Sequence, residues 1–482
     1  MKKQALALIF ANGVNFLVNF AMNPFMARQL SYEDNGTYSQ VSLVNGYALV
    51  LFGLGISSIL NLLFSEYKKD LKLVMSTTFW IQFVSGILCT LLIFFLRDGI
   101  GTVFENKQLP YYLMLYLPST FFMVLTNLSL YYFIYYNKAR QLSILTISLN
   151  LLKIAVTFYA INYLHSLFYA IVFQNIVNAI QLILHMLLLR KEMFPIKKPN
   201  WENIRYTLKL SYPYLAMAII GYSILTVNGI IVSNQLGLTE YAIYRNGAIE
   251  IPFIATLYSS ITAVALPQIV EYARSNRLYE LMVLKRQISN TVAAVVYPVV
   301  FFCILNANEF MSLYLGDKYL RSGAVFGIYN IALLVRINSY SDILTIYNKP
   351  TKILIPNIIS LASGIGANFV LIKFLGINGA AIAFVISLLI FSLLLISSTC
   401  REIGISWKTY FDLKTLGSIS AISFSGALLT VFFSQKNIFA FCISGFIYFV
   451  GVYFLLLKFK MIDINLIPEK LRNIVSKLYK TS

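Results

Sequence analysis

The sequence is poor in the residues that build catalytic and metal sites. It has two histidines and four cysteines among 482 residues, and only 12% of the chain is charged. His165 and His185 are isolated in the sequence, and the cysteines lie in apolar runs without metal-ligand or disulfide spacing. Hydrolase, Walker A, zinc-protease and dinucleotide-binding motifs are also missing. We therefore predict no catalytic residue, no metal and no cofactor, and we do not expect an enzyme.

Long polar stretches are missing as well, and hydrophobic residues make up 59% of the chain. The longest polar gaps, of about twenty residues, are too short for a separate soluble domain. A run of about twenty apolar residues crosses the hydrocarbon layer of a membrane as a helix. We therefore predict an all-α polytopic membrane protein with about fourteen transmembrane helices. The predicted segments are residues 5–27, 38–64, 73–96, 111–136, 141–163, 166–189, 210–235, 241–267, 288–307, 323–347, 354–373, 378–400, 413–433 and 438–458.

The positive charge is unevenly distributed over the gaps between these segments. The chain has 38 Lys and Arg against 19 Asp and Glu. Gaps on the side of the N-terminus hold 28 of the basic residues, and the opposite gaps hold seven. By the positive-inside rule, both termini are predicted to be cytoplasmic. The net charge of +19 thus reports topology, and it argues against a nucleic-acid partner.

A short internal repeat indicates how the segments are grouped. Residues 27–38 align without gaps on residues 233–244, one set of six helices later. Parallel six-helix repeats are a transporter architecture, with substrate between the halves and alternating access by rocking. The predicted parts are a six-helix bundle over 1–190, a cytoplasmic linker over 191–209, a second bundle over 210–400, two further helices over 413–458 and an amphipathic cytoplasmic tail over 460–482.

Two apolar segments carry stripes of amide side chains. Amides in a membrane commonly bond neighbouring helices, but complete stripes also suit a water-filled cavity, and the pattern leaves both interpretations open. Amides can also donate to and accept from sugar hydroxyls. The candidate cavity-lining residues are Asn12, Asn15, Asn19 and Asn23 in the first segment and Gln174, Asn178 and Gln181 in the sixth, the latter followed by His185.

Charged residues inside the apolar segments are sharper candidates, because a charge at the bilayer centre costs about 3 kcal/mol or more. The candidate cations are Lys153, Arg245 and Arg336, with Arg28 at the end of the first segment. We expect them to line a cationic cavity, and Tyr340 shares a helix face with Arg336. The comparably deep acids are Glu250 and Asp342, which are candidates for coupling to H⁺ or Na⁺. The alternative is a set of internal ion pairs, Arg336 with Asp342 and Arg245 with Glu250.

Several loose motifs are spread along the chain: residues 15–31 with Gly36 and Tyr38, and residues 211–213, 266–268, 315–319 and 374–383. Together they resemble the polysaccharide transporter branch of the MOP superfamily, the Wzx-type O-antigen and lipid-linked oligosaccharide flippases. The resemblance covers almost the whole chain. It implies two six-helix bundles in a V-shaped arrangement, two further helices, and a cationic cavity for an undecaprenyl-pyrophosphate-linked glycan. Of the cavity cations, only Arg28 lies in a motif; the other three are inferred from depth.

The resemblance leads us to expect a flippase in the bacterial inner membrane that moves a lipid-linked oligosaccharide from the cytoplasmic to the outer leaflet. Its partners would be that substrate, membrane lipids and the polysaccharide polymerase and chain-length machinery. A multidrug exporter of the same fold is the nearest alternative, although it should prefer an acidic cavity. A membrane glycan polymerase or ligase would need a larger outer loop than the roughly fifteen residues near 308–322.

Overall fold

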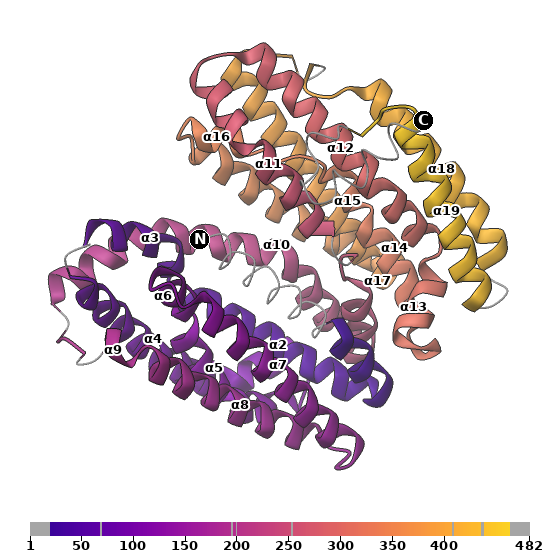
Figure 1. Ribbon diagram of the computed structural model, residues 1–482. Helices are drawn as coiled ribbons and strands as arrows, with labels where there is room; N and C mark the ends of the chain where they lie inside the picture. Colours follow the sequence, from indigo (N-terminus) through magenta and orange to yellow (C-terminus); the bar gives the residue numbers. More distant parts are fainter. Residues whose placement is uncertain are drawn as a thin grey trace. The chain divides into compact units, whose positions relative to one another are not determined.

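The computed structural model describes residues 20–67, 70–193, 196–198, 200–251, 254–406, 409–434 and 438–462. Within these ranges the regular secondary structure is helical (Figure 1), and ten helices are long and apolar enough to cross a membrane. The predicted class, an all-helical multi-pass membrane protein, is therefore confirmed. The count of fourteen segments stays a prediction, since most of the first one lies outside the described residues.

The chain divides into two compact units, Met1–Ala242 and Ile243–Ser482. The predicted linker over 191–209 lies inside the first unit, so contacts group the seventh predicted segment with the first six. The division into two six-helix bundles, with that segment in the second, stays a prediction. The amphipathic tail predicted over 460–482 lies almost entirely outside the described residues.

The first unit is built from helices that lie side by side, with α4 against α5, α5 against α8 and α7 against α8 (Figure 1). Residues 20–29 are helical and precede α2. The helices that follow are α2 (Tyr32–Phe52), α3 (Ile56–Glu66), α4 (Leu71–Val103), α5 (Leu109–Thr126), α6 (Ser129–Tyr135), α7 (Ala139–Asn162), α8 (Leu167–Leu188), α9 (Arg190–Met193) and the greater part of α10 (Trp201–Gly247).

Helix α4 shows how this unit reverses the pattern of a water-soluble bundle. Its polar side chains Thr78, Gln82 and Ser85 are buried, whereas Leu88 and Phe95 are 54% and 73% exposed. Exposed large apolar side chains are stable where the surroundings are hydrocarbon, and buried polar groups are stable where neighbouring helices bond them. The exposed apolar side of α4 is therefore suited to lipid.

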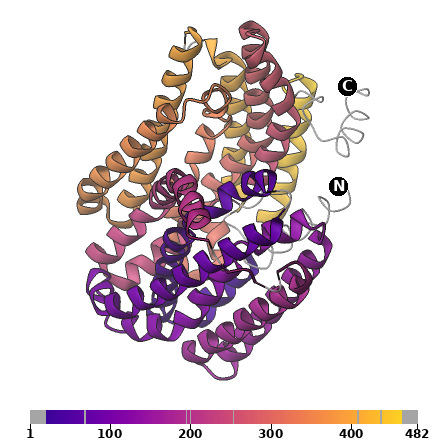
Figure 2. The ribbon, with the colours of Figure 1, turned by 90° about the vertical axis from the view of Figure 1, so that its left-hand side faces the viewer.

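In the second unit, α12 packs against α11, α14, α18 and α19. Figure 2 shows α12 beside the yellow pair α18 and α19, as Figure 1 does. The helices are α11 (Ile254–Arg274), α12 (Leu278–Leu305), α13 (Ala307–Leu315), the 3₁₀ turn η1 (Asp317–Tyr319), α14 (Ser322–Asn330), α15 (Ala332–Val335), α16 (Asp342–Ile346), α17 (Thr351–Ile403), α18 (Leu413–Ser434) and α19 (Ile438–Lys458).

Two of the longest helices are interrupted by a glycine in a left-handed conformation. The φ angle is 81° at Gly237 in α10 and 56° at Gly376 in α17. Glycine adopts positive φ at little cost because it has no Cβ atom. Both interruptions fall in predicted gaps, 236–240 and 374–377, so these two segment boundaries are confirmed.

Candidate functional site

Two helices of the second unit are broken where the sequence predicted continuous segments. The segment predicted over 323–347 leaves helical geometry at residues 336–341, between α15 and α16. The segment predicted over 241–267 is not helical at residues 248–251, after α10 ends. The prediction of continuous helices is wrong at both places. The sequence carries signals that the prediction passed over: Gly247 and Pro252 flank residues 248–251, and residues 336–341 contain Asn338, Ser339 and Ser341 but no Gly or Pro.

Side chains from neighbouring helices satisfy the backbone carbonyl groups that the break at 336–341 releases. Helices α12 and α17 supply the donors. This compensation is necessary because lipid provides no hydrogen bonds to an open backbone. The bonds run from Tyr297 Oη to Leu334 O (2.8 Å), from Lys285 Nζ to Ser339 O (2.6 Å) and from Thr399 Oγ1 to Tyr340 O (3.0 Å).

The break at residues 248–251 is held by one buried amide, that of Asn330 at the end of α14. Its Nδ2 donates to Ile249 O at 2.9 Å, and its Oδ1 accepts from Ile251 N at 2.9 Å. The amide side chain therefore bonds the broken backbone on both sides, as a neighbouring peptide group would. Asn330 is fully buried, and it links α14 to residues 249–251.

A buried ion pair lies beside the break at residues 336–341. Lys285 Nζ on α12 and Asp342 Oδ2 at the start of α16 are 2.7 Å apart, with side-chain exposures of 0% and 9%. Asp342 Oδ1 also accepts from Ile343 N at 2.8 Å. A buried charge is stable only when it is paired and hydrogen-bonded, and both conditions are met here.

A second ion pair joins the two breaks and is more open. Arg336, the first residue of one break, pairs through Nη1 with Glu250 Oε1 in the other, and the side chains are 43% and 32% exposed. The alternative pairs suggested by the sequence, Arg336 with Asp342 and Arg245 with Glu250, are wrong. Each of those pairs lies five or six residues apart in the chain, a spacing that does not place two side chains face to face on a helix.

Lys285 was missed by the sequence analysis, which began the ninth segment at residue 288 and counted this lysine among the cytoplasmic loop cations. In the structure α12 begins ten residues earlier, at Leu278. Leu278, Leu281 and Lys285 recur at helical spacing, and Leu281 and Lys285 are both buried. That periodicity is the signal in the sequence that marks Lys285 as an inward-facing residue.

The other predicted cations do not gather in one unit. Arg245 is exposed near the end of α10 and lies, with Glu250 and Arg336, near enough to Tyr329 to act on it electrostatically. Arg28 is exposed at the end of the helical residues 20–29, in the first unit. Lys153 is half-buried on α7 and has no ion-pair partner among the described residues. Of these predicted residues, the structure joins Arg336 and Glu250 in an ion pair.

The predicted amide stripe of the sixth segment bonds neighbouring helices. Gln174 is buried, with Oε1 accepting from Tyr38 Oη and Nε2 donating to Thr157 Oγ1, both at 3.2 Å. Asn178 is also buried and donates to Ser119 Oγ at 2.8 Å. These contacts favour interhelical bonding over a cavity for Gln174 and Asn178.

The remaining predicted site residues are placed as follows. Asn12, Asn15 and Asn19 lie outside the described residues, Asn23 is exposed and Gln181 is half-buried. Tyr340 is buried, and its hydroxyl donates to Val335 O within the break. Among the described residues, no group of three or more His, Cys, Asp or Glu is arranged to hold a metal ion.

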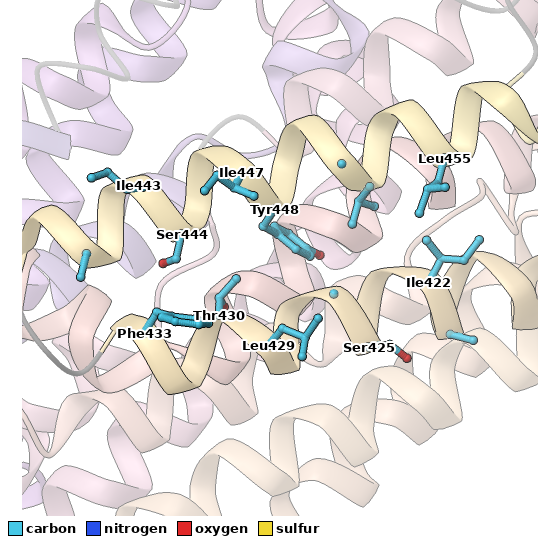
Figure 3. Close-up of a pocket in the computed structure, with 15 residues that line it drawn as sticks. Ile422, Ser425, Leu429, Thr430, Phe433, Ile443, Ser444, Ile447, Tyr448 and Leu455 are labelled. Atoms are coloured by element: carbon cyan, nitrogen blue, oxygen red, sulfur yellow. The ribbon is translucent and has the colours of Figure 1, made fainter. Parts of the chain in front are cut away.

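A large apolar groove lies between α18 and α19, with a volume of about 980 Å³ (Figure 3). Ile422, Leu429 and Ile447 line it, and Ser425 and Ser444 add isolated hydroxyls. The ring of Tyr448 also lines the groove, while its hydroxyl lies 2.9 Å from Pro298 O and from Ser423 O. Because its walls are hydrocarbon and carry no charge, the groove is suited to an alkyl or isoprenoid chain.

The sequence matches the family described as "Polysaccharide biosynthesis protein" over residues 25–324. The match covers more than half of the chain, so the protein belongs to this family. No curated protein matches the sequence significantly.

Solved structures show the same fold at low sequence identity. The lipid II flippase MurJ, in an inward closed conformation, is similar with a TM-score of 0.71 and 17% identity over 94% of this chain and 99% of its own. A multidrug resistance MATE transporter of the MOP superfamily, facing inward, is similar with a TM-score of 0.64 and 15% identity, over 81% of this chain and 94% of its own. A MOP superfamily transporter from Pyrococcus furiosus, described as having a binding pocket of reverse polarity, is similar with a TM-score of 0.56 and 14% identity. That match covers 83% of this chain and 94% of the other. The chain therefore shares the fold of these solved structures.

Proposed function

We propose that the protein is a flippase that translocates an undecaprenyl-pyrophosphate-linked oligosaccharide from the cytoplasmic to the outer leaflet by alternating access. Family membership and the transporter fold support a lipid-linked glycan as cargo. The single structural observation that carries the proposal is the Arg336–Glu250 pair, which is half-exposed and joins two helix breaks. Broken helices inside a membrane mark binding sites in transporters.

Arg336 is the residue that we expect to bind the pyrophosphate. Its guanidinium group can donate two parallel hydrogen bonds to phosphate oxygens. Arg245, exposed near the end of α10, is a further candidate cation for the anion. Glu250 must leave Arg336 when the anion arrives, so the resting ion pair keeps the arginine in place between transport cycles. Arg28 and Lys153 of the first unit remain candidate cations of the predicted cavity.

The lipid and sugar parts of the substrate need different surroundings. The isoprenoid chain stays in hydrocarbon, for which the α18–α19 groove offers a matching surface. Amide and hydroxyl groups suit the sugar, and Asn23, exposed within the helical residues 20–29, is one such group. Amides such as Gln174, whose bonds are already used between helices, are weaker candidates.

A direct test replaces Arg336 and follows the lipid-linked glycan in cells. Arg336→Ala should abolish export and cause the undecaprenyl-linked oligosaccharide to accumulate in the cytoplasmic leaflet, measured by mass spectrometry and by leaflet-specific labelling. Arg336→Lys keeps the charge and should retain more export. Normal export by Arg336→Ala would refute the proposed site. Accumulation in the outer leaflet would identify a polymerase or ligase, and loss of resistance to cationic drugs would identify a multidrug exporter.

Ion coupling, to H⁺ or Na⁺, is part of the proposal, and Glu250 is the better of the two predicted carboxylates. Asp342 is held by a buried lysine, whereas Glu250 is 32% exposed and is released when the anion takes Arg336. A membrane potential negative inside also favours outward movement of the anion, by about 2.3 kcal/mol per charge per 100 mV. Glu250→Gln should still bind the lipid-linked glycan but should not respond to a pH gradient in proteoliposomes. A response equal to that of the unchanged protein would leave substrate gradient and membrane potential as the driving forces.

We further propose that the protein lies in the bacterial inner membrane with both termini cytoplasmic, working beside the polymerase and chain-length proteins. A cysteine at Lys107, an exposed residue, should label from the outer face, whereas one at exposed Ser275 should not. Asn106 is unsuitable for this test because it is buried and bonds Thr37 and Gln40. The reverse labelling pattern would overturn the topology.

A further inference from the structure

The Lys285 ammonium group occupies a pocket whose walls are typical of a cation site. It donates to the carboxylate oxygen Asp342 Oδ2 at 2.7 Å and to the main-chain carbonyl Ser339 O at 2.6 Å. The ring of Tyr410 completes the surroundings, with its centre 5.9 Å from Nζ. The Lys285 side chain is 0% exposed, so no water reaches the charge.

The carbonyl group comes from the broken segment 336–341, and this origin is informative. In transporters, unwound backbone carbonyls inside the membrane commonly bind dissolved cations such as Na⁺, and a nearby carboxylate balances the charge. Here the same two ligand types are present, but they face a cation that is covalently part of α12. Asn338, in the same break, donates to Lys285 O at 2.9 Å and to Ser289 Oγ at 2.7 Å, which fixes the segment against α12.

One further ligand atom is available in this break. Asn338 Oδ1 is buried and accepts no hydrogen bond from any group that the structure describes. An amide oxygen is a good ligand for a small monovalent cation. A dissolved cation in place of Nζ would thus have a carboxylate, a carbonyl and an aromatic face, with an amide oxygen in the same stretch of chain.

We propose that Lys285 is a tethered cation, which fills a monovalent-cation site made by Ser339 O and Asp342, and that the site binds free ammonium or an alkali ion when the side chain is shortened. An ordinary structural ion pair would only neutralise the charge of Asp342. It would not bind a free cation after the lysine side chain is shortened. The site itself stands independently of the flippase proposal. Its consequence rests on that proposal: no dissolved ion acts at Asp342 in the natural protein, which leaves Glu250 as the coupling carboxylate.

The test compares the unchanged protein with four full-length variants, one of them Asp342→Asn alone, each purified in detergent. The measurement is thermal unfolding in ammonium, sodium or choline chloride at equal ionic strength. Lys285→Ala leaves space for an ion. Without ammonium its melting temperature should be lower than that of the unchanged protein, and added ammonium should raise it to a plateau. Lys285→Met fills the space without a charge and should not respond. Lys285→Ala combined with Asp342→Asn removes the anionic ligand and should not respond either. The unchanged protein should show no difference between ammonium and choline.

Two results would overturn the proposal. One is a Lys285→Ala protein that responds no more to ammonium or sodium than to choline. The other is a specific ammonium or sodium effect in the unchanged protein that Asp342→Asn abolishes, because the site would then bind a dissolved ion with Lys285 in place. If Lys285→Ala is lost during purification, its membrane-inserted amount in cells grown with or without ammonium gives the same comparison. The proposal would again be contradicted if ammonium did not raise the membrane-inserted amount of Lys285→Ala while the Lys285→Ala, Asp342→Asn double variant accumulated.

Discussion

Each unit contains a helix break inside an apolar segment, and the two breaks are built in different ways. In the first unit, residues 53–55 separate α2 from α3 and contain two glycines, with Gly55 at φ 66°. Neutral side chains donate hydrogen bonds to the carbonyl groups at this break. Gln82 Nε2 donates to Gly53 O at 3.2 Å, and Ser85 Oγ donates to Phe52 O at 2.7 Å. In the second unit, residues 336–341 contain no glycine, and their carbonyl groups are bonded by side chains that include a buried lysine.

The difference separates a break made by the local chain from one made by its neighbours. Glycine lowers the cost of leaving helical geometry, so the first break needs little help from charge. The second break, at residues 336–341, has no glycine, and the ion pairs Lys285–Asp342 and Arg336–Glu250 hold it open. A break held by charged groups can be altered by a charged ligand, which suits the unit where we place the anion site.

The largest expected effect is the loss of one member of the buried pair. Asp342→Ala leaves Lys285 buried without a counter-ion and should destabilise the protein by about 3–5 kcal/mol, seen as a fall in melting temperature in detergent. Adding Lys285→Met should recover much of this loss, because the pair is then replaced by neutral side chains. A double variant no more stable than Asp342→Ala would show that the charges do not hold the second break.

The next effect tests the glycine in the first break. Gly55→Ala forces an alanine into the left-handed region, at about 1–2 kcal/mol. Its Cβ atom would also lie 2.6 Å from Leu215 N and 2.8 Å from Ser211 O, both rigid backbone atoms of α10. We expect a clear loss of melting temperature, larger than that of Gly237→Ala, whose added Cβ has open space around it. Equal losses in the two variants would mean that contact with α10 contributes nothing.

A smaller effect is expected from the neutral donor of the first break. Gln82→Leu keeps the size of the side chain but leaves Gly53 O without its 3.2 Å bond, which should cost about 1 kcal/mol. Thermal unfolding measures the loss, with Gln141→Leu, an exposed position, as the matched control. A loss as large as that of Asp342→Ala would erase the contrast between the two breaks.

The smallest effect on stability should come from the open pair. Arg336 and Glu250 are 43% and 32% exposed, so Glu250→Gln should change stability by less than about 1 kcal/mol. The same variant should alter the response of transport to a pH gradient. A stability loss comparable with that of Asp342→Ala would assign Glu250 a structural role and weaken its role in coupling.

Sequence patterns reached the fold more readily than the site. Long apolar runs predicted the membrane class, and Gly237 and Gly376 lie in predicted gaps because glycine acts on its own stretch of backbone. The break at 53–55 also carries two glycines, but the predicted segment 38–64 ran through them, since their neighbours are uniformly apolar. Depth in the segments selected Arg336, Glu250 and Asp342 as candidate residues, and the structure places each of them in an ion pair. Depth omitted Lys285 because the start of α12 was placed too late.

What the sequence by itself determined is the environment of each segment: hydrocarbon for the apolar runs, water for the charged gaps, and membership of a polysaccharide biosynthesis family. These properties add up residue by residue along the chain. Only the tertiary structure decided that Asp342 pairs with Lys285 and Glu250 with Arg336, and that residues 336–341 leave the helix. The reason is physical: the energy of an ion pair or of an open carbonyl depends on which side chain of another helix lies within about 3 Å, and packing sets that distance.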